Sequence, residues 1–299
     1  MTTGYIFDKR CIKHELGWGH PESPERLVEI QKRMHETGLD QEVREVAFLE
    51  DPMPYTKMIH SDAHIASVQR IPTTGSIAEL AVSGVLGAVQ AVSNGVINNA
   101  FCAVRPPGHH AHNSGGEEGF CFYNNIAIAA RYAQSVCNRA KILIIDWDYH
   151  HGNGTEWSFY DDPSVLFFST HHWFAYPGTG DPARQGTGDG HGYTINEPLL
   201  PGATDDDIIK VWEKSLLPRA DSFKPDFVFI SAGFDSREND LLGCFSITDD
   251  GFAHLTRMAL TIAKTHCNGR LVSTLEGGYN VQGLARAVTA HVGALVEGK

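Results

Sequence analysis

The chain alternates between short apolar runs and longer segments in which apolar residues recur at helical spacing. The short runs lie at residues 101–104, 142–145, 165–168, 227–230 and 271–275, and a similar run occupies residues 4–8. Runs of this length, rich in β-branched and aromatic residues, are typical of strands buried on both faces of a parallel sheet. The helix-length segments lie at residues 24–36, 76–98, 124–136, 204–220, 248–266 and from about 281.

Two of the helical segments carry signals of a helix N-terminus. Thr204 is followed by three aspartates and Thr248 by two, and hydroxyl caps followed by acidic residues are favourable there. Because strands alternate with helices, we predict an α/β fold with a predominantly parallel, doubly wound sheet flanked by helices. Neither an internal repeat nor a shift in composition divides the chain, so we predict a single domain over residues 1–299.

Composition narrows the class of protein. The 24 basic and 36 acidic residues give a net charge of −12, and Lys and Arg do not cluster, which disfavours nucleic acid as a partner. An acidic field suits cationic substrates such as lysine-bearing peptides or polyamines, although it also serves solubility alone. The six cysteines form no Cys-x-x-Cys pair, and no uninterrupted apolar run approaches about 20 residues. We expect no signal peptide. We therefore expect a cytoplasmic protein without a membrane partner.

Glycine-rich connections follow several of the apolar runs. They lie at residues 106–119, 171–192, 236–245 and 276–279. Loops this long in a compact domain are usually functional or disordered, and ligands of open α/β sheets bind beyond the carboxyl ends of the strands. We therefore expect these connections to converge on one rim of the sheet and to build the site there.

A metal site is predicted where the run at 142–145 ends in acids and histidines. Asp148 and His150 are two residues apart, so in extended backbone their side chains project to one side. Asp235 follows the run at 227–230 and is the natural third ligand. Two carboxylates and one imidazole, without a thiolate, resemble an open catalytic site. Zn²⁺ fits this set, and Fe²⁺, Mn²⁺ or Co²⁺ could also bind it.

Further polar residues on the same rim are candidates for proton transfer. The rigid turn at residues 105–108 would direct His109 and His110 at the rim, where one could be the general base, although buried histidines are often structural. Asp146 could orient an imidazole from behind. Tyr279 could polarise a substrate carbonyl or simply pack on the terminal helix. Residues 17–20 either line the rim or form a turn.

The motifs, taken together, resemble a known family. They are HPESPER from His20, RPPGHHA from Arg105, GFCFYNN from Gly119, IDWDYHHGNGT from Ile145, SAGFDS from Ser231 and LEGGYN from Leu275. Over nearly its whole length the chain is similar to the zinc-dependent histone deacetylase and acetylpolyamine amidohydrolase family. That resemblance implies an arginase-like α/β fold with its active site at the carboxyl ends of the strands.

The resemblance also implies a role for each matching residue. The implied zinc ligands are Asp148, His150 and Asp235. The implied catalytic group pairs His109 with Asp146, makes His110 the general base and Tyr279 the oxyanion donor, and includes Asn153 beside His110. The implied substrate tunnel comprises Gly119, Phe120, Tyr176 and Leu242. Family members also bind a structural K⁺, here implied at Asp146, Asp148, His150, Ser169 and Thr170.

Two positions refine the resemblance. Asn153 stands where class I members have aspartate, so the chain resembles class II enzymes, and the neutral amide should leave His110 with a lower pKa than a carboxylate would. Leu242 matches the gatekeeper position, where polyamine-selective members carry glutamate. Its apolar side chain argues against polyamine selectivity. The neighbouring residues 239–241 depart from the usual Gly-Asp-Pro.

We therefore predict a zinc-dependent amidohydrolase that removes acetyl or other acyl groups from lysine side chains of proteins or peptides. One alternative keeps this chemistry but acts on acetylpolyamines or other small N-acyl amines. Another alternative, from a different class, is a non-catalytic module that binds acyl-lysine. The expected partner is thus an acylated protein, peptide or small amine, and the oligomeric state is left open.

Overall fold

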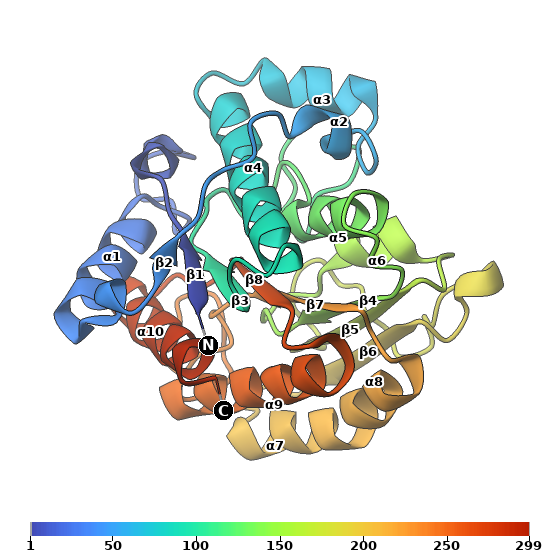
Figure 1. The fold of residues 1–299 in the computed structure, drawn as a ribbon. Coiled ribbons are helices and arrows are strands. Elements are labelled where there is room, and N and C mark those ends of the chain that lie inside the picture. The colour runs from blue at the N-terminus through green and yellow to red at the C-terminus, as the bar shows by residue number, and fades with distance from the viewer. Residues whose placement is uncertain (1, 299) are drawn as a thin grey trace.

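The computed structural model describes residues 2–298 and contains one sheet of eight parallel strands (Figure 1). The strands are β1 (Thr3–Ile6), β2 (Arg44–Glu45), β3 (Asn99–Cys102), β4 (Ile142–Asp146), β5 (Val165–His172), β6 (Thr194–Leu199), β7 (Phe227–Ala232) and β8 (Leu271–Leu275). Their order across the sheet is β2-β1-β3-β8-β7-β4-β5-β6. The predicted α/β fold with a parallel sheet is confirmed.

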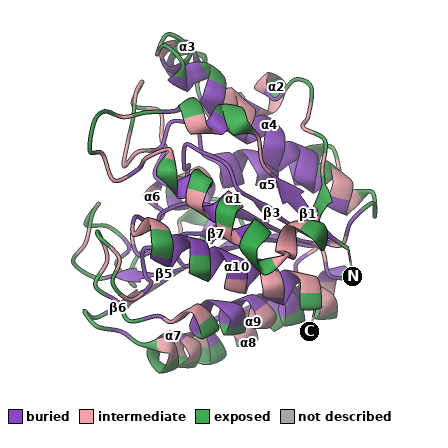
Figure 2. Cartoon of the chain, turned by 90° about the vertical axis from the view of Figure 1, so that its left-hand side faces the viewer, coloured by how far each residue is buried: buried purple, intermediate pink, exposed green. Residues whose placement is uncertain are grey.

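Helices cover both faces of this sheet. They are α1 (Glu25–Thr37), α2 (Met53–Thr56), α3 (Asp62–Gln69), α4 (Thr74–Ser93), α5 (Asn125–Ser135), α6 (Asn153–Phe159), α7 (Asp205–Val211), α8 (Leu217–Phe223), α9 (Asp249–Cys267) and α10 (Val281–Glu297). In Figure 1, α4 and α5 lie above the sheet, and α7 to α10 lie below it. Figure 2 shows the buried strands enclosed between helices whose outer surfaces are exposed.

Alternation along the central strands explains why each strand is apolar throughout. Leu143 and Ile145 belong to the hydrophobic cluster that includes α9 and α10, whereas Ile142 and Ile144 belong to the cluster that includes α4 and α5. Successive side chains of a strand point to opposite faces, so a strand covered on both sides needs an apolar residue at every position. The same alternation places Val228 and Phe229 in different clusters.

Several elements differ from the prediction. The helix expected over 76–98 ends at Ser93, because Asn94 and Gly95 follow it and the chain turns into β3. The helix expected over 204–220 is divided by a π-helical turn at Trp212–Leu216. Asp207 completes a capping box with Thr204, as a hydroxyl-acid N-terminus requires. The short β2, the edge strand β6 and helices α2, α3 and α6 were not predicted.

Helix α4 has the length and average hydropathy of a membrane span, although polar residues such as Glu79 and Gln90 interrupt its apolar sequence. Within residues 2–298 it is the one helix of that kind, and 72% of its most apolar window is buried. The helix packs on strands β1, β3 and β8 and on α5. Its apolar surface is therefore used in the core.

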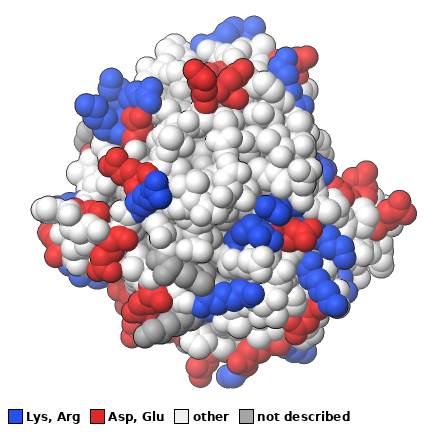
Figure 3. Space-filling view, viewed as in Figure 1, with Lys and Arg blue, Asp and Glu red and all other residues white. Residues whose placement is uncertain are grey.

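Charges of both signs lie close together on the surface. On the face drawn in Figure 3, Lys and Arg side chains are interspersed with Asp and Glu, and much of the remaining surface is uncharged. A face of this kind offers no continuous basic track of the sort that a nucleic-acid backbone requires.

Strands β4, β7 and β8 end almost level with one another, whereas β5 continues to His172. Asp146 at the end of β4 pairs in register with Ser169 of β5 and Ser231 of β7. Ser231 in turn pairs with Thr274, next to the end of β8. Because these strands are parallel, the connections that follow them begin on the same edge of the sheet. The glycine-rich connections thus start side by side, as the sequence predicted.

Candidate active site

Three residues on the connections after β4 and β7 form a compact group of metal donors. One ligand atom from each of Asp148, His150 and Asp235 lies within 4.8 Å of the others. The His150 Nδ1 atom is 2.9 Å from Asp235 Oδ2 and 3.3 Å from Asp148 Oδ1. Both carboxylates are buried. A concentration of buried anionic oxygens beside an imidazole fits a divalent cation, because such charges are costly without one.

Backbone N–H groups hold these carboxylates in place. The Tyr149 N–H donates to Asp235 Oδ1 and the Gly277 N–H donates to Asp148 Oδ2, each over 2.8 Å. Glycine is required at 277, because a Cβ there would collide with carboxylate oxygens of Asp148 and Asp235. Asp148 and His150 lie in a bend rather than in extended backbone, yet both still reach the same point.

The tandem histidines lie beside this group with a different partner for each ring. His109 Nδ1 is 3.0 Å from Asp146 Oδ2, and His110 Nδ1 is 2.7 Å from Asn153 Oδ1. The two ring centroids are 4.0 Å apart. The pairing of His109 with Asp146 and of His110 with Asn153 that the sequence suggested is therefore present.

The two histidines have opposite pKa shifts. Burial alone would lower the pKa of His109, but the carboxylates of Asp148 and Asp146 outweigh it and raise that pKa well above its ordinary value. Burial, reinforced by the positive charge on His109, holds the pKa of His110 well below its ordinary value. The Asn153 Oδ1 atom can only accept a hydrogen bond, so His110 carries its proton on Nδ1 and donates it to this oxygen. The unprotonated Nε2 atom is then free to act as a base.

A cavity of about 400 Å³ opens beside these groups. Its lining comprises His110, Glu117, Gly119, Phe120, His150, Tyr176, Leu242 and Tyr279. The cavity thus brings together one metal donor, the proposed base and the residues that the sequence assigned to a substrate tunnel. Leu242 is 40% exposed, so it lies toward the opening of the cavity.

Close packing shapes the walls of the cavity. The Phe120 ring contacts Tyr279 and His20 edge-on, with centroids 5.8 Å and 4.6 Å apart. Gly119 has φ +53° and lies so close to His110 and Tyr176 that a Cβ there would collide with both rings. Phe120 has φ 69°, an uncommon value for a non-glycine residue.

Tyr279 presents a phenol that remains protonated. Burial, followed by the nearby Asp235 carboxylate, raises its pKa well above the ordinary value of 10.0. Its backbone N–H donates to Asp240 Oδ2 over 2.7 Å, which fixes the loop that carries the ring. The Arg26 guanidinium carbon lies 5.1 Å from the ring centroid. The phenol is therefore neutral and is held in place to act as a hydrogen-bond donor.

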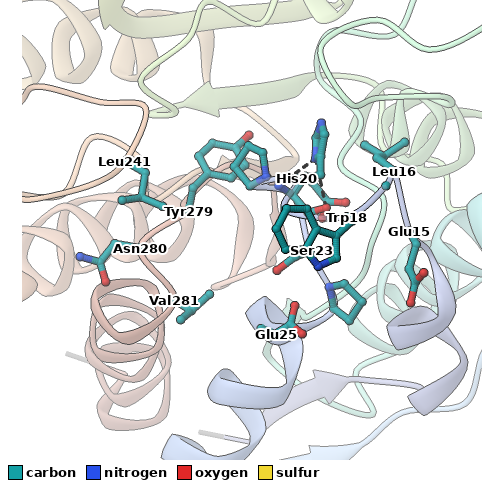
Figure 4. Close-up of a pocket in the computed structure, with 15 residues that line it drawn as sticks. Glu15, Leu16, Trp18, His20, Ser23, Glu25, Leu241, Tyr279, Asn280 and Val281 are labelled. Carbon is teal, nitrogen blue, oxygen red and sulfur yellow. Dashed lines mark hydrogen bonds between the residues drawn. The ribbon is translucent and has the colours of Figure 1, made fainter.

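The segment at residues 17–20 lines the rim rather than forming an isolated turn. Together with residues 279–281 it borders a second hollow of about 800 Å³, shown in Figure 4. Tyr279 lines both hollows. Trp18 is fully exposed at the tip of this segment, between Gly17 and Gly19, whose φ angles are +123° and +72°.

Glu276 belongs to the site although the sequence reasoning missed it. Its buried carboxylate accepts the backbone N–H groups of Gly108 (2.7 Å) and His109 (3.2 Å). Arg26 was missed too, and its guanidinium donates to the carbonyl oxygens of Glu276 and Gly278. The signal available for Glu276 was an acid between a buried strand and two glycines.

The residues predicted to hold K⁺ lie on the neighbouring strands β4 and β5 and in the connection that follows β4. Ser169 Oγ is 2.9 Å from His171 Nδ1, and Thr170 Oγ1 is buried without a hydrogen-bond partner in residues 2–298. Asp146 Oδ1 accepts the Asp148 N–H over 3.1 Å. The potassium site itself stays a prediction.

Comparison with known proteins identifies the family. The model of the histone deacetylase domain matches residues 20–295. The chain belongs to the histone deacetylase family.

Relatives of this family align along most of the chain. A probable deacetylase from Archaeoglobus fulgidus is 39% identical over 303 residues, which cover 95% of this chain and 83% of that protein. Histone deacetylase 9 from Homo sapiens is 34% identical and covers 99% of this chain, but the chain matches 34% of the human protein's length. The crystal structure of the HDA15 HD domain aligns with a TM-score of 0.92 at 34% identity, covering 99% of this chain and 88% of that domain.

These comparisons make the chain a hydrolytic deacetylase on the histone deacetylase fold. The family is zinc-dependent, and the donor group Asp148, His150 and Asp235 lies where such an ion would be held. The role of each individual site residue remains a prediction that the geometry supports.

Proposed function

We propose that this deacetylase uses Zn²⁺ to remove acyl groups from lysine side chains of proteins or peptides. The observation that carries the proposal is the cavity itself. A metal donor, a neutral imidazole and a protonated phenol, from His150, His110 and Tyr279, line one space of about 400 Å³. Its opening carries the apolar Leu242, which suits the aliphatic stem of an acyl-lysine.

The residues divide the reaction among them. A Zn²⁺ ion held by Asp148, His150 and Asp235 would supply Lewis acidity and lower the pKa of water. His110 accepts a proton from the attacking water at Nε2 and later returns it to the leaving amine. Tyr279 donates its phenolic hydrogen to the carbonyl oxygen as that oxygen gains negative charge.

Other residues hold these groups in position. Asn153 accepts from His110 Nδ1–H and so keeps Nε2 free, while Asp146 orients His109. For the structural K⁺ we propose the site implied by the family, beneath the metal, at Asp146, Asp148, His150, Ser169 and Thr170. The buried, unpartnered hydroxyl of Thr170 supports a cation in this region.

The acid limb of the pH profile tests the role of His110. Asn153→Asp places an anion beside Nδ1, which stabilises the imidazolium and raises the pKa of His110 by about one unit or more. Because the base must be neutral, the acid limb of kcat/KM should move to higher pH by the same amount. Asn153→Ala is the control, since it removes the acceptor without adding charge. An unshifted limb in Asn153→Asp would argue that His110 is not the base.

A second substrate class has one observation in its favour. Glu117 is exposed and lines the cavity near its opening, so its carboxylate could attract the distal ammonium of an acetylpolyamine. Leu242 on the same cavity argues for the lysine side chain instead, because it offers no charge to a second ammonium.

Specificity constants measured side by side decide between these substrates. We expect kcat/KM for an acetyl-lysine peptide to exceed that for acetylputrescine or acetylspermidine by about tenfold or more. Leu242→Glu adds a charge at the opening and should move this ratio toward the polyamine by about tenfold, whereas Leu242→Gln should not. A wild-type preference for the polyamine would refute the assignment to lysine side chains.

A further inference from the structure

The connection between β3 and α5 contains both the tandem histidines and part of the cavity wall. His109 and His110 lie on its outgoing limb, and Gly119 and Phe120 lie on its returning limb. Neither limb has regular secondary structure over most of its length. Within the connection, the His112 N–H donates to Glu118 Oε2 over 2.8 Å and so joins the two limbs at one point. Side chains outside the connection join them at further points.

His60, just before α3, joins the two limbs of this connection. Its Nδ1 atom is 2.9 Å from the carbonyl oxygen of His112 on the outgoing limb. Its Nε2 atom is 2.9 Å from the backbone nitrogen of Asn124 on the returning limb, whose N–H donates to it. The contact at His112 lies two residues beyond His110.

His64, one helical turn later, joins the limbs a second time. Its Nε2 atom is 2.7 Å from the carbonyl oxygen of Phe122, and its Nδ1 atom accepts the N–H of Gly115 over 3.0 Å. The rings of His60 and His64 stack with centroids 4.7 Å apart and an interplanar angle of 23°. The two imidazoles thus form parallel rungs between the limbs.

The partners fix the tautomer of each ring. A carbonyl oxygen can only accept and a backbone N–H can only donate, so His60 is protonated on Nδ1 and His64 on Nε2. All four ring nitrogens are then satisfied, and the residues are 2% and 1% exposed. Burial, and then the neighbouring His64, lowers the pKa of His60 to about 3, so that ring stays neutral.

Two further contacts hold the same stretch from the same side. The Ser67 hydroxyl on α3 donates to the carbonyl oxygen of Gly115, and the Ser61 N–H donates to Asn113 Oδ1 over 2.8 Å. The wall residue Phe120 has its own support, because its N–H donates to Glu117 Oε1 over 2.8 Å. Together with the rungs, these contacts hold residues 112–115, the stretch that follows the tandem histidines.

We propose that His60 and His64 are positioning residues that hold His109 and His110 in register with the metal donors. The alternative is that they are ordinary core histidines whose loss weakens the whole fold. Ordinary core packing does not account for opposite tautomers that each bridge the same two limbs. The kinetic consequence rests on the proposed deacylase function, whereas the structural consequence does not.

Variants of His64 and Ser67 in the metal-loaded protein test this proposal. His64→Ala removes one rung. His64→Gln places an amide near Nε2 and keeps the bond to Phe122, and His64→Asn places one near Nδ1 and keeps the bond to Gly115. Ser67→Ala removes a bond to the same limb from a partly exposed position, with little risk to folding. Ser222→Ala on α8 is the matched control. The Ser222 hydroxyl also donates to a backbone carbonyl oxygen, that of Arg219, but this bond lies within α8 and away from the connection.

Two readouts separate positioning from stability. Amide hydrogen exchange of residues 106–124 should become about tenfold faster in His64→Ala, while the strands β4 and β7 stay as protected as in the wild type. At a temperature where every variant is folded, kcat should fall by about 10- to 100-fold, because a displacement of about 1 Å at catalytic groups costs that much. KM should change by less than about threefold.

The graded variants complete the test. Each amide variant should recover part of the loss seen in His64→Ala, Ser67→Ala should lower kcat by about two- to fivefold, and Ser222→Ala should match the wild type. Faster exchange spread evenly over the sheet, or a kcat within about twofold of the wild type in His64→Ala, would overturn the proposal. If the wild type shows no deacylase activity, the proposed function fails, and the exchange pattern alone still decides whether the rungs hold the connection.

Discussion

Protein stripped of metal should lose hydrolysis of an acetyl-lysine peptide entirely and regain it on addition of Zn²⁺. The physical reason lies in the donor group, where Asp148 and Asp235 place two buried carboxylates within 4.8 Å of an imidazole. Without Lewis acidity, water near neutral pH is too weak a nucleophile for an amide, since its pKa is about 15.7 and falls to about 7 on a zinc ion. The remaining groups cannot supply that difference.

The metal should also stabilise the fold, which gives a readout independent of catalysis. An ion that binds the folded state alone contributes about 2.7 kcal/mol at a concentration 100 times its dissociation constant. The thermal midpoint should therefore rise with added Zn²⁺ in the wild type. Asp235→Asn should lose both the activity and most of this rise, whereas Asp240→Asn, which alters a nearby carboxylate outside the donor group, should keep the rise. Metal-free protein that hydrolyses the peptide at the wild-type rate would exclude the mechanism.

The parts of the fold that the sequence predicted are those with a strong local signal. Each central strand must be apolar at every position, because neighbouring residues such as Ile144 and Ile145 face different hydrophobic clusters. A short apolar run is therefore visible without any knowledge of its neighbours. The edge strand β6 reads Thr-Ile-Asn-Glu-Pro-Leu and is only partly buried, so its composition does not separate it from a loop.

The site follows the same rule. Asp148 and His150 were found because they are neighbours in sequence, and Asp235 because acids at strand ends share one edge of a parallel sheet. Glu276 and His60 were not found, because their partners Gly108 and His112 are 168 and 52 residues away. No local pattern marks His60, whereas the one local signal for Glu276 was an acid between a buried strand and two glycines.

The last prediction concerns the phenol, for which Tyr279→Phe should lower kcat by about 100- to 1,000-fold with little change in KM. Removing one donor to a developing oxyanion costs this much in turnover, because the interaction is stronger in the transition state than with the bound substrate. The ring itself should stay in place. Its contacts with Phe120 and Arg26 and the backbone bond to Asp240 do not involve the hydroxyl.

Tyr176 offers the matched control for this variant, because the cavity has a second phenol on its lining. Tyr176→Phe removes a hydroxyl from the same space and should change kcat by less than about threefold, since we assign Tyr176 to the tunnel wall and not to the carbonyl oxygen. Steady-state kinetics with one acetyl-lysine peptide distinguish the two variants. Equal losses in both would point to a general change of polarity in the cavity. A loss confined to Tyr279→Phe would locate the oxyanion at the end of β8, beside the metal donors of β4 and β7, where the level strand ends bring the three loops together.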